Sequence, residues 1–141
     1  MLIATDVLLR NTMTESLLPA ATKSLRIVVA DDEAFIREYF TRMLPRLGHQ
    51  VVGVATNGQE LVDICAAEKP DLIITDIQMP ELSGIEAADE ISKSQSIPII
   101  IVSSHDKPET DNQNIVGFLV KPFETEALAE AIAKAESGDS K

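Results

Sequence analysis

The chain has 141 residues, with 23 acidic and 12 basic side chains and a formal net charge of −11. That length supports one domain with a hydrophobic core and is too short for two ordinary ones. The negative charge repels nucleic acid phosphates and anionic membrane surfaces, so we expect no direct nucleic acid partner and no membrane partner. No apolar run approaches the roughly 20 residues that cross a bilayer, and the single cysteine, Cys65, has no internal disulfide partner. A cytoplasmic location follows as the expectation.

Residues 1–24 lack a helical or strand pattern, and we expect a disordered N-terminal tail there, with translation starting at Met1 or Met13. From residue 25 onward, short β-branched apolar runs alternate with longer segments of helical period. We therefore expect one domain over residues 25–136 and a C-terminal tail over 137–141. The apolar runs predict strands at 25–30, 51–54, 71–75, 97–102 and 117–120.

The first helical segment carries a broad apolar stripe at three- and four-residue spacing. Pro45 should distort the last turn of this helix, and Gly48 should end it. A second helix begins after Asn57, with Glu60 placed as in a capping box, and Pro70 closes the unit. The apolar stripe of the first helix consists of Phe35, Ile36, Tyr39, Phe40, Met43, Leu44 and Leu47.

Two further helices are expected at about 84–94 and 124–136. The polar stretch "KPETDNQNIV" at 107–116 predicts at most a short or irregular helix. Continuous apolar strands that alternate with helices are typical of a parallel sheet covered on both faces. The expected fold is thus a doubly wound α/β domain with a five-stranded parallel sheet, in which ligands gather outside the carboxyl ends of the strands.

Polar side chains follow four of these strands and should meet at one edge of the sheet. Asp31 and Asp32 follow the first strand, and Asp76 follows the third. At an effective dielectric constant of about 20, each pair of carboxylates roughly 4 Å apart costs on the order of 4 kcal/mol, so three of them favour a bound cation. Oxygen ligands with room for water suit Mg²⁺.

Ser103 and Ser104 follow the fourth strand, and Lys121 follows the fifth. With a cation and an ammonium nearby, Asp76 can act as a nucleophile toward phosphorus, while Ser103 and Lys121 contact the phosphoryl oxygens. Each residue also has a plain structural interpretation, because surface acids solvate loops, serines cap strand ends and lysines are common on surfaces. Glu33 is interpreted as helix N-terminal charge.

His49 and His105 lie in expected loops without a second ligand spaced for a metal ion, so neither predicts a metal site. Gly84 is interpreted as a turn residue, since no glycine-rich phosphate loop surrounds it.

Five segments together resemble the receiver (phosphoacceptor) domain of two-component response regulators. They are "VVADDEAFIREYF", "VGVATNGQELV", "DLIITDIQMPELSGIE", "IPIIIVSS" and "GFLVKPFETEAL". The resemblance implies a flavodoxin-like fold with phosphorylation on Asp76 by a sensor histidine kinase or a phosphotransfer protein. It also implies that Mg²⁺ is held by Asp31, Asp32, Asp76 and the backbone carbonyl of Gln78.

The same resemblance implies that Ser103 is a hydroxyl switch residue, Phe118 an aromatic switch residue, and Lys121 a phosphoryl-contacting lysine before a cis Pro122. Such a domain is no enzyme beyond its own phosphorylation and dephosphorylation. Two departures stand out. The interval between Ser103 and Lys121 is shorter than usual by roughly one helical turn. The chain also ends at Lys141, which leads us to expect a stand-alone receiver whose output is contact with an unidentified protein.

Two other functions remain open. One is a protein-binding module of the same fold that works without phosphorylation. The other is a metal-dependent phosphohydrolase, which would need a general acid two residues after Asp76, where the chain has Gln78.

Overall fold

The computed structural model describes residues 23–104 and 107–137. The predicted N-terminal tail up to residue 22, His105 and residues 138–141 lie outside these ranges. Within them, none of the helices is long and apolar enough to span a bilayer. The elements are β1 (Arg26–Ala30), α3 (Ala34–Arg46), β2 (Gln50–Ala55), α4 (Gly58–Glu68), β3 (Leu72–Asp76), α5 (Gly84–Ser92), β4 (Ile99–Ser103), β5 (Ile115–Val120) and α6 (Thr125–Ser137).

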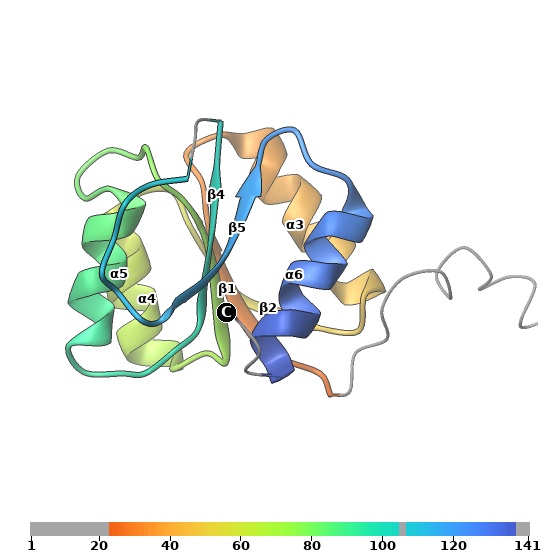
Figure 1. Cartoon of the computed structure of the whole chain (residues 1–141), viewed down its shortest axis with the longest axis horizontal. Helices are drawn as coiled ribbons and strands as arrows, with labels where there is room; N and C mark the ends of the chain where they lie inside the picture. Colours follow the sequence, from red (N-terminus) through yellow and green to blue (C-terminus); the bar gives the residue numbers. More distant parts are fainter. Residues whose placement is uncertain (1–22, 105–106, 138–141) are drawn as a thin grey trace, which may run out of the picture.

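The five strands form one parallel sheet in the order β2-β1-β3-β4-β5. Figure 1 shows α4 and α5 on one side of the sheet and α3 and α6 on the other. Each side has its own apolar core, centred on Ile74 and Leu128 on the α3/α6 side and on Ile73 and Leu61 on the α4/α5 side. The predicted doubly wound fold is confirmed.

The strands lie where the apolar runs predict them, because a central parallel strand must be apolar on both of its faces. All residues of β3 and β4 are buried, as are the last four of β1. The largest shifts are of two residues: β4 begins at Ile99 rather than at residue 97, and β5 at Ile115 rather than at residue 117. Cys65 is buried in the core of the α4/α5 side, as a small apolar residue would be.

Side-chain caps fix the starts of two helices. The Asn57 side chain accepts a hydrogen bond from the Glu60 backbone N–H at 2.8 Å, which confirms the predicted cap of α4. The predicted capping box is wrong, however, because the Glu60 carboxylate accepts its hydrogen bonds from Thr56. A complete capping box lies at α5, where Ser83 and Glu86 exchange both hydrogen bonds.

The end of α3 is tightened, because the N–H groups of Leu47 and Gly48 donate to carbonyls three residues back, at 3.0 Å. Pro45 lies inside the helix, which continues to Arg46. Gly48 then adopts a φ of 96°, the left-handed conformation that glycine tolerates best. The buried His49 follows it, and its Nδ1 accepts a hydrogen bond from the Leu25 N–H at 3.1 Å. This histidine is therefore structural, in agreement with the sequence.

The connection between β4 and β5 has no helix in its described residues 107–114, as its polar sequence predicts. It runs beside α5 instead (Figure 1). Asn112 donates to the Asp89 carboxylate at 2.9 Å and to the Ser92 hydroxyl at 3.1 Å, and Asn114 donates to Ser92 at 3.0 Å. Side-chain hydrogen bonds to α5 thus hold a segment that forms no helix of its own.

Candidate functional site

The carboxyl ends of the strands place four side chains at one edge of the sheet. Asp76 is the last residue of β3 and pairs in register with Val102, so Ser103 at the end of β4 lies one position beyond it. Asp31 directly follows β1, and Lys121 directly follows β5, where its N–H donates to the Ser103 carbonyl at 2.7 Å. The fold brings these predicted residues to one place.

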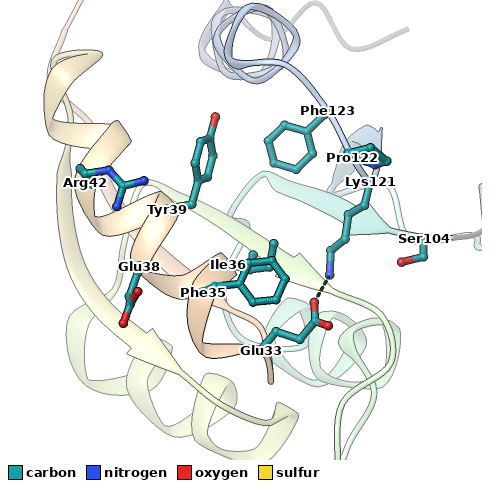
Figure 2. Close-up of a pocket in the computed structure, with 10 residues that line it drawn as sticks. All are labelled: Glu33, Phe35, Ile36, Glu38, Tyr39, Arg42, Ser104, Lys121, Pro122 and Phe123. Atoms are coloured by element: carbon teal, nitrogen blue, oxygen red, sulfur yellow. Dashed lines mark ion pairs between the residues drawn. The ribbon is translucent and has the colours of Figure 1, made fainter.

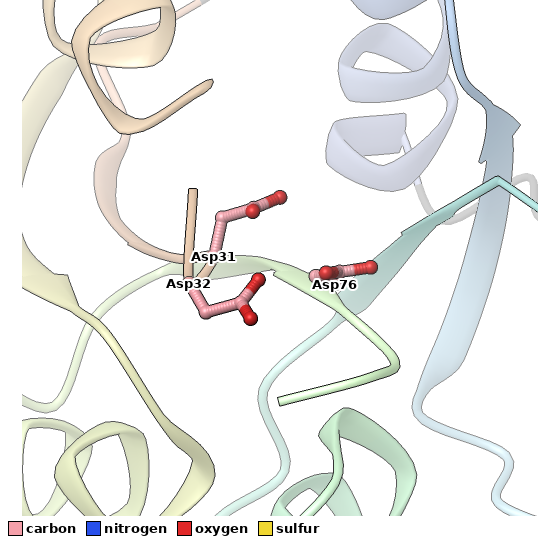
Figure 3. Close-up of side chains that lie close together, drawn as sticks. All are labelled: Asp31, Asp32 and Asp76. Atoms are coloured by element: carbon pink, nitrogen blue, oxygen red, sulfur yellow. The ribbon is translucent and has the colours of Figure 1, made fainter. Parts of the chain in front are cut away.

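Asp31, Asp32 and Asp76 form an acidic cluster at this edge (Figure 3). One carboxylate oxygen from each residue lies within 4.8 Å of the other two. Asp31 and Asp76 are buried, whereas Asp32 is exposed. Burial, followed by the charge of Asp31, raises the pKa of Asp76, although Lys121 partly opposes the rise. The cluster is therefore electrostatically strained when no cation is bound.

Lys121 supplies the balancing positive charge. Its ammonium lies 2.9 Å from Asp31 Oδ2, 3.6 Å from Asp76 Oδ2 and 3.6 Å from Glu33 Oε1. Burial lowers the pKa of Lys121, but the three carboxylates outweigh that effect and the net pKa is raised. The lysine is thus held protonated beside the proposed nucleophile.

The two oxygens of Asp31 differ in their surroundings. Oδ1 accepts a hydrogen bond from the Glu33 backbone N–H at 2.9 Å. Oδ2 is buried and has no hydrogen-bond partner of good geometry among the described residues, and the Lys121 ammonium lies 2.9 Å from it. A buried carboxylate oxygen of this kind is suited to act as a ligand of a cation. Together with Asp32 and Asp76 it makes an oxygen cluster compatible with Mg²⁺.

The structure gives the positions of three further predicted site residues, Gln78, Ser103 and Phe118. Gln78 is exposed two residues beyond the end of β3. Ser103 is buried at the end of β4. Phe118 lies on β5 opposite Ile101, half-buried against the core of the α4/α5 side. The metal contact of Gln78 and the switching of Ser103 and Phe118 remain predictions.

The close approach of α5 to β3 depends on Gly84. Its N–H donates to the Ile77 carbonyl at 2.7 Å. A Cβ atom at this position would collide with the backbone carbonyl oxygen of Asp76. Gly84 therefore does more than serve a turn, because it lets the helix pack directly against the backbone of the predicted phosphoacceptor.

An apolar cavity of about 600 Å³ adjoins the site between α3 and the segment after β5 (Figure 2). Phe35 at its mouth is 65% exposed, so its assignment to the inner stripe of the helix is wrong. Phe35 lies four residues before the half-buried Tyr39, and this spacing did not distinguish the helix's inner face from its rim. The cavity is lined by Glu33, Phe35, Ile36, Glu38, Tyr39, Arg42, Ser104, Lys121, Pro122 and Phe123.

Glu33 is the other site residue that the sequence missed. It occupies the N-cap position of α3 as expected, but its side chain makes no capping hydrogen bond. The carboxylate instead faces Lys121 across the cavity, as the dashed line in Figure 2 shows. Its place directly after two acids on a strand end was the available signal.

Comparison with known proteins agrees with this geometry. Residues 27–133 match the family described as the response regulator receiver domain. The chain is 37% identical over 116 residues to the transcriptional regulatory protein PdtaR of Mycobacterium tuberculosis, covering 79% of this chain and 57% of that protein. It is 36% identical over 114 residues to the chemotaxis protein CheY of Thermotoga maritima, covering 77% of this chain and 95% of that protein.

Among solved structures, the response regulator protein TrrA of Thermotoga maritima, in complex with Mg(2+)-BeF, superposes with a TM-score of 0.70. The two chains are 34% identical, and the match covers 78% of this chain and 97% of TrrA. Residues 27–133, which match the family, include Asp31, Asp32, Asp76 and Lys121. The chain belongs to the receiver domain family of two-component response regulators.

Proposed function

We propose that this receiver accepts a phosphoryl group on Asp76, in a reaction that requires Mg²⁺, and signals through contact with another protein. The observation that supports it most directly is the position of the Asp76 carboxylate, within 3.6 Å of the Lys121 ammonium and beside two further carboxylates. A phosphoryl acceptor needs a nucleophilic oxygen together with positive charge that stabilises the transferring oxygens. This sheet edge offers both.

Asp31, Asp32, Asp76 and the carbonyl of Gln78 would hold the ion. When bound, Mg²⁺ would neutralise the carboxylates and stabilise the negative oxygens of the phosphoryl group. An Asp76 oxygen forms the new bond to phosphorus as the bond to the donor breaks, and the donor keeps that electron pair. Lys121 pairs with one phosphoryl oxygen.

The Asp76 oxygens are oriented before the reaction. Oδ1 accepts a hydrogen bond from the Ile77 N–H at 2.8 Å, and Oδ2 faces Lys121. Ser103 follows Val102, the residue that pairs with Asp76 in the sheet. Its hydroxyl group donates a hydrogen bond to a second phosphoryl oxygen. Hydrogen bonds to charged groups contribute roughly 1.5–3 kcal/mol each, so Ser103 and Lys121 together can drive much of a conformational change.

Receiver domains of this family interact with histidine kinases or phosphotransfer proteins, and such a protein is the proposed donor here, in the cytoplasm. The apolar cavity beside Lys121 fits that role, because a donor must bring its phosphoryl group to the same edge of the sheet. Phe35 offers the donor a large exposed side chain at the mouth of the cavity.

Incubation with acetyl phosphate, followed by intact-mass measurement, tests the reaction without a donor protein. The wild type should gain one phosphoryl group with Mg²⁺ present and none after chelation. Asp76→Asn should gain none under either condition, whereas the exposed α4 variant Asp63→Asn should label normally. Labelling of Asp76→Asn would exclude Asp76 as the acceptor.

A second candidate is a binding module that works without phosphorylation. The helix-free connection at 107–114 favours it, since this segment lies on the side of the sheet that carries Phe118. Equal affinity for a protein partner before and after acetyl phosphate treatment would support this candidate over the first.

A further inference from the structure

The ion pairs of Lys121 pose a problem for the proposed reaction. Its ammonium lies closest to Asp31 Oδ2, at 2.9 Å. That oxygen is the buried one without a hydrogen-bond partner of good geometry, and hence the one most available to a cation. The lysine and a divalent cation therefore compete for the same carboxylate oxygen. A cation bound to this oxygen would displace the ammonium from Asp31, whereas the proposed reaction needs the ammonium to stay near Asp76.

Moving the ammonium away from a carboxylate is costly in a buried site. The Lys121 side chain is only 12% exposed, so water cannot replace the lost ion pair fully. A second carboxylate that stays close to the ammonium after it leaves Asp31 would reduce that cost. Glu33 provides one, with Oε1 at 3.6 Å from the lysine nitrogen.

The Glu33 side chain is suited to this role because, among the described residues, Lys121 is the one ion-pair partner of its carboxylate. The residue is the N-cap of α3, but its carboxylate makes no capping hydrogen bond. The side chain is 49% exposed and lies on the cavity side of Lys121, away from the acidic cluster's buried floor. Its backbone N–H meanwhile holds Asp31 Oδ1, which keeps the two acids in a fixed relation.

We propose that Glu33 is a positioning residue for Lys121, a second counter-ion that receives the ammonium when a cation takes Asp31. This inference rests on the proposed function and assigns one further residue to it. Glu33 thereby links cation binding to the presence of a lysine free to contact the phosphoryl group.

The test is Mg²⁺ titration by isothermal calorimetry on the whole chain without any phosphodonor. Glu33→Gln should weaken Mg²⁺ binding by about two- to fivefold, the range of a partly exposed ion pair. Glu38→Gln is the matched control, because it removes the same charge from the same cavity and the described residues show no ion pair between Glu38 and Lys121. It should change the affinity by less than about 1.5-fold.

A double-mutant cycle then separates positioning from a simple effect of charge. In a Lys121→Met background there is no ammonium to receive, so Glu33→Gln should leave the Mg²⁺ affinity unchanged. If Lys121→Met does not fold, Lys121→Gln gives the same comparison. Equal weakening by Glu33→Gln with and without the lysine, or equal effects of the Glu33 and Glu38 variants, would overturn the inference. Failure of the wild type to bind Mg²⁺ would instead overturn the proposed function.

Discussion

Replacing Asp76 by asparagine should stabilise the protein in the absence of Mg²⁺. The Asp76 side chain is 10% exposed and lies close to Asp31 and Asp32, which repel it, and to Lys121, which attracts it. At an effective dielectric constant of about 20, each such pair contributes on the order of 4 kcal/mol at 4 Å. The two repulsions outnumber the one attraction, so about one repulsive pair is left uncompensated. Because Asp32 is exposed, water weakens its repulsion of Asp76.

We therefore expect Asp76→Asn to raise the free energy of unfolding by about 1–3 kcal/mol at neutral pH. Asparagine retains an oxygen that can accept the Ile77 hydrogen bond, so little is lost in exchange. The sign agrees with the raised pKa of Asp76, because a raised pKa means that ionisation opposes folding. The gain should shrink as the pH falls toward about 4, where an unfolded aspartate also becomes protonated.

Thermal unfolding followed by circular dichroism in EDTA measures this difference. The midpoint should rise by about 4 °C for each kcal/mol in a domain of this size. The control Asp63→Asn, on an exposed face of α4, should change stability by less than about 0.5 kcal/mol. Mg²⁺ at one hundred times its dissociation constant should raise the free energy of unfolding of the wild type by about 2.7 kcal/mol, and it should raise that of Asp76→Asn by less. An Asp76→Asn protein that is no more stable than wild type in EDTA would refute the electrostatic reasoning.

Four further outcomes are expected. Phe35→Ala should slow phosphotransfer from a donor protein about five- to thirtyfold, as loss of an interface anchor does, and leave acetyl phosphate labelling unchanged. Burial lowers the pKa of His49 in the folded protein, so as the pH falls the unfolded chain binds a proton before the folded protein does. The melting temperature should therefore fall as the pH drops through about 6.5. The His49→Gln variant should lack this pH dependence. Gly84→Ala should cost at least about 2 kcal/mol in urea unfolding, because its Cβ meets a backbone carbonyl. Asn112→Ala should speed hydrogen exchange in residues 107–114 and leave Mg²⁺ affinity unchanged.

The sequence was informative where one residue's environment follows from its strand. A parallel strand buried on both faces must be apolar throughout, so the runs around Ile74 and Ile100 located the centre of the sheet. Since all strands point the same way, the residues after them had to meet at one edge. Asp31, Asp76 and Lys121 follow from that rule, and the ion pairs between them agree with it.

The sequence was uninformative where a side chain's partner is distant and its direction is free. Glu33 reads equally well as a helix-terminal charge, and only the path of the segment after β5 brings Lys121 to its carboxylate. Phe35 fits the helical period of the core, yet it is largely exposed and lines the cavity instead. Asn112 carries no periodic signal, although its amide fixes the β4–β5 connection.

The opposing demands on Lys121 explain why the site is arranged around one lysine and several acids. Without a cation, the ammonium compensates Asp31 and Asp76 and limits a repulsion that would otherwise favour unfolding. In the proposed reaction, with a cation bound, the same ammonium contacts the phosphoryl oxygens instead. Moving a two-state equilibrium from 1:99 to 99:1 takes about 5.5 kcal/mol, close to what two hydrogen bonds to charged groups supply. If the phosphoryl contacts of Ser103 and Lys121 are to drive such a change, breaking the Asp31 ion pair must cost little, and in our proposal the second carboxylate at Glu33 keeps that cost low.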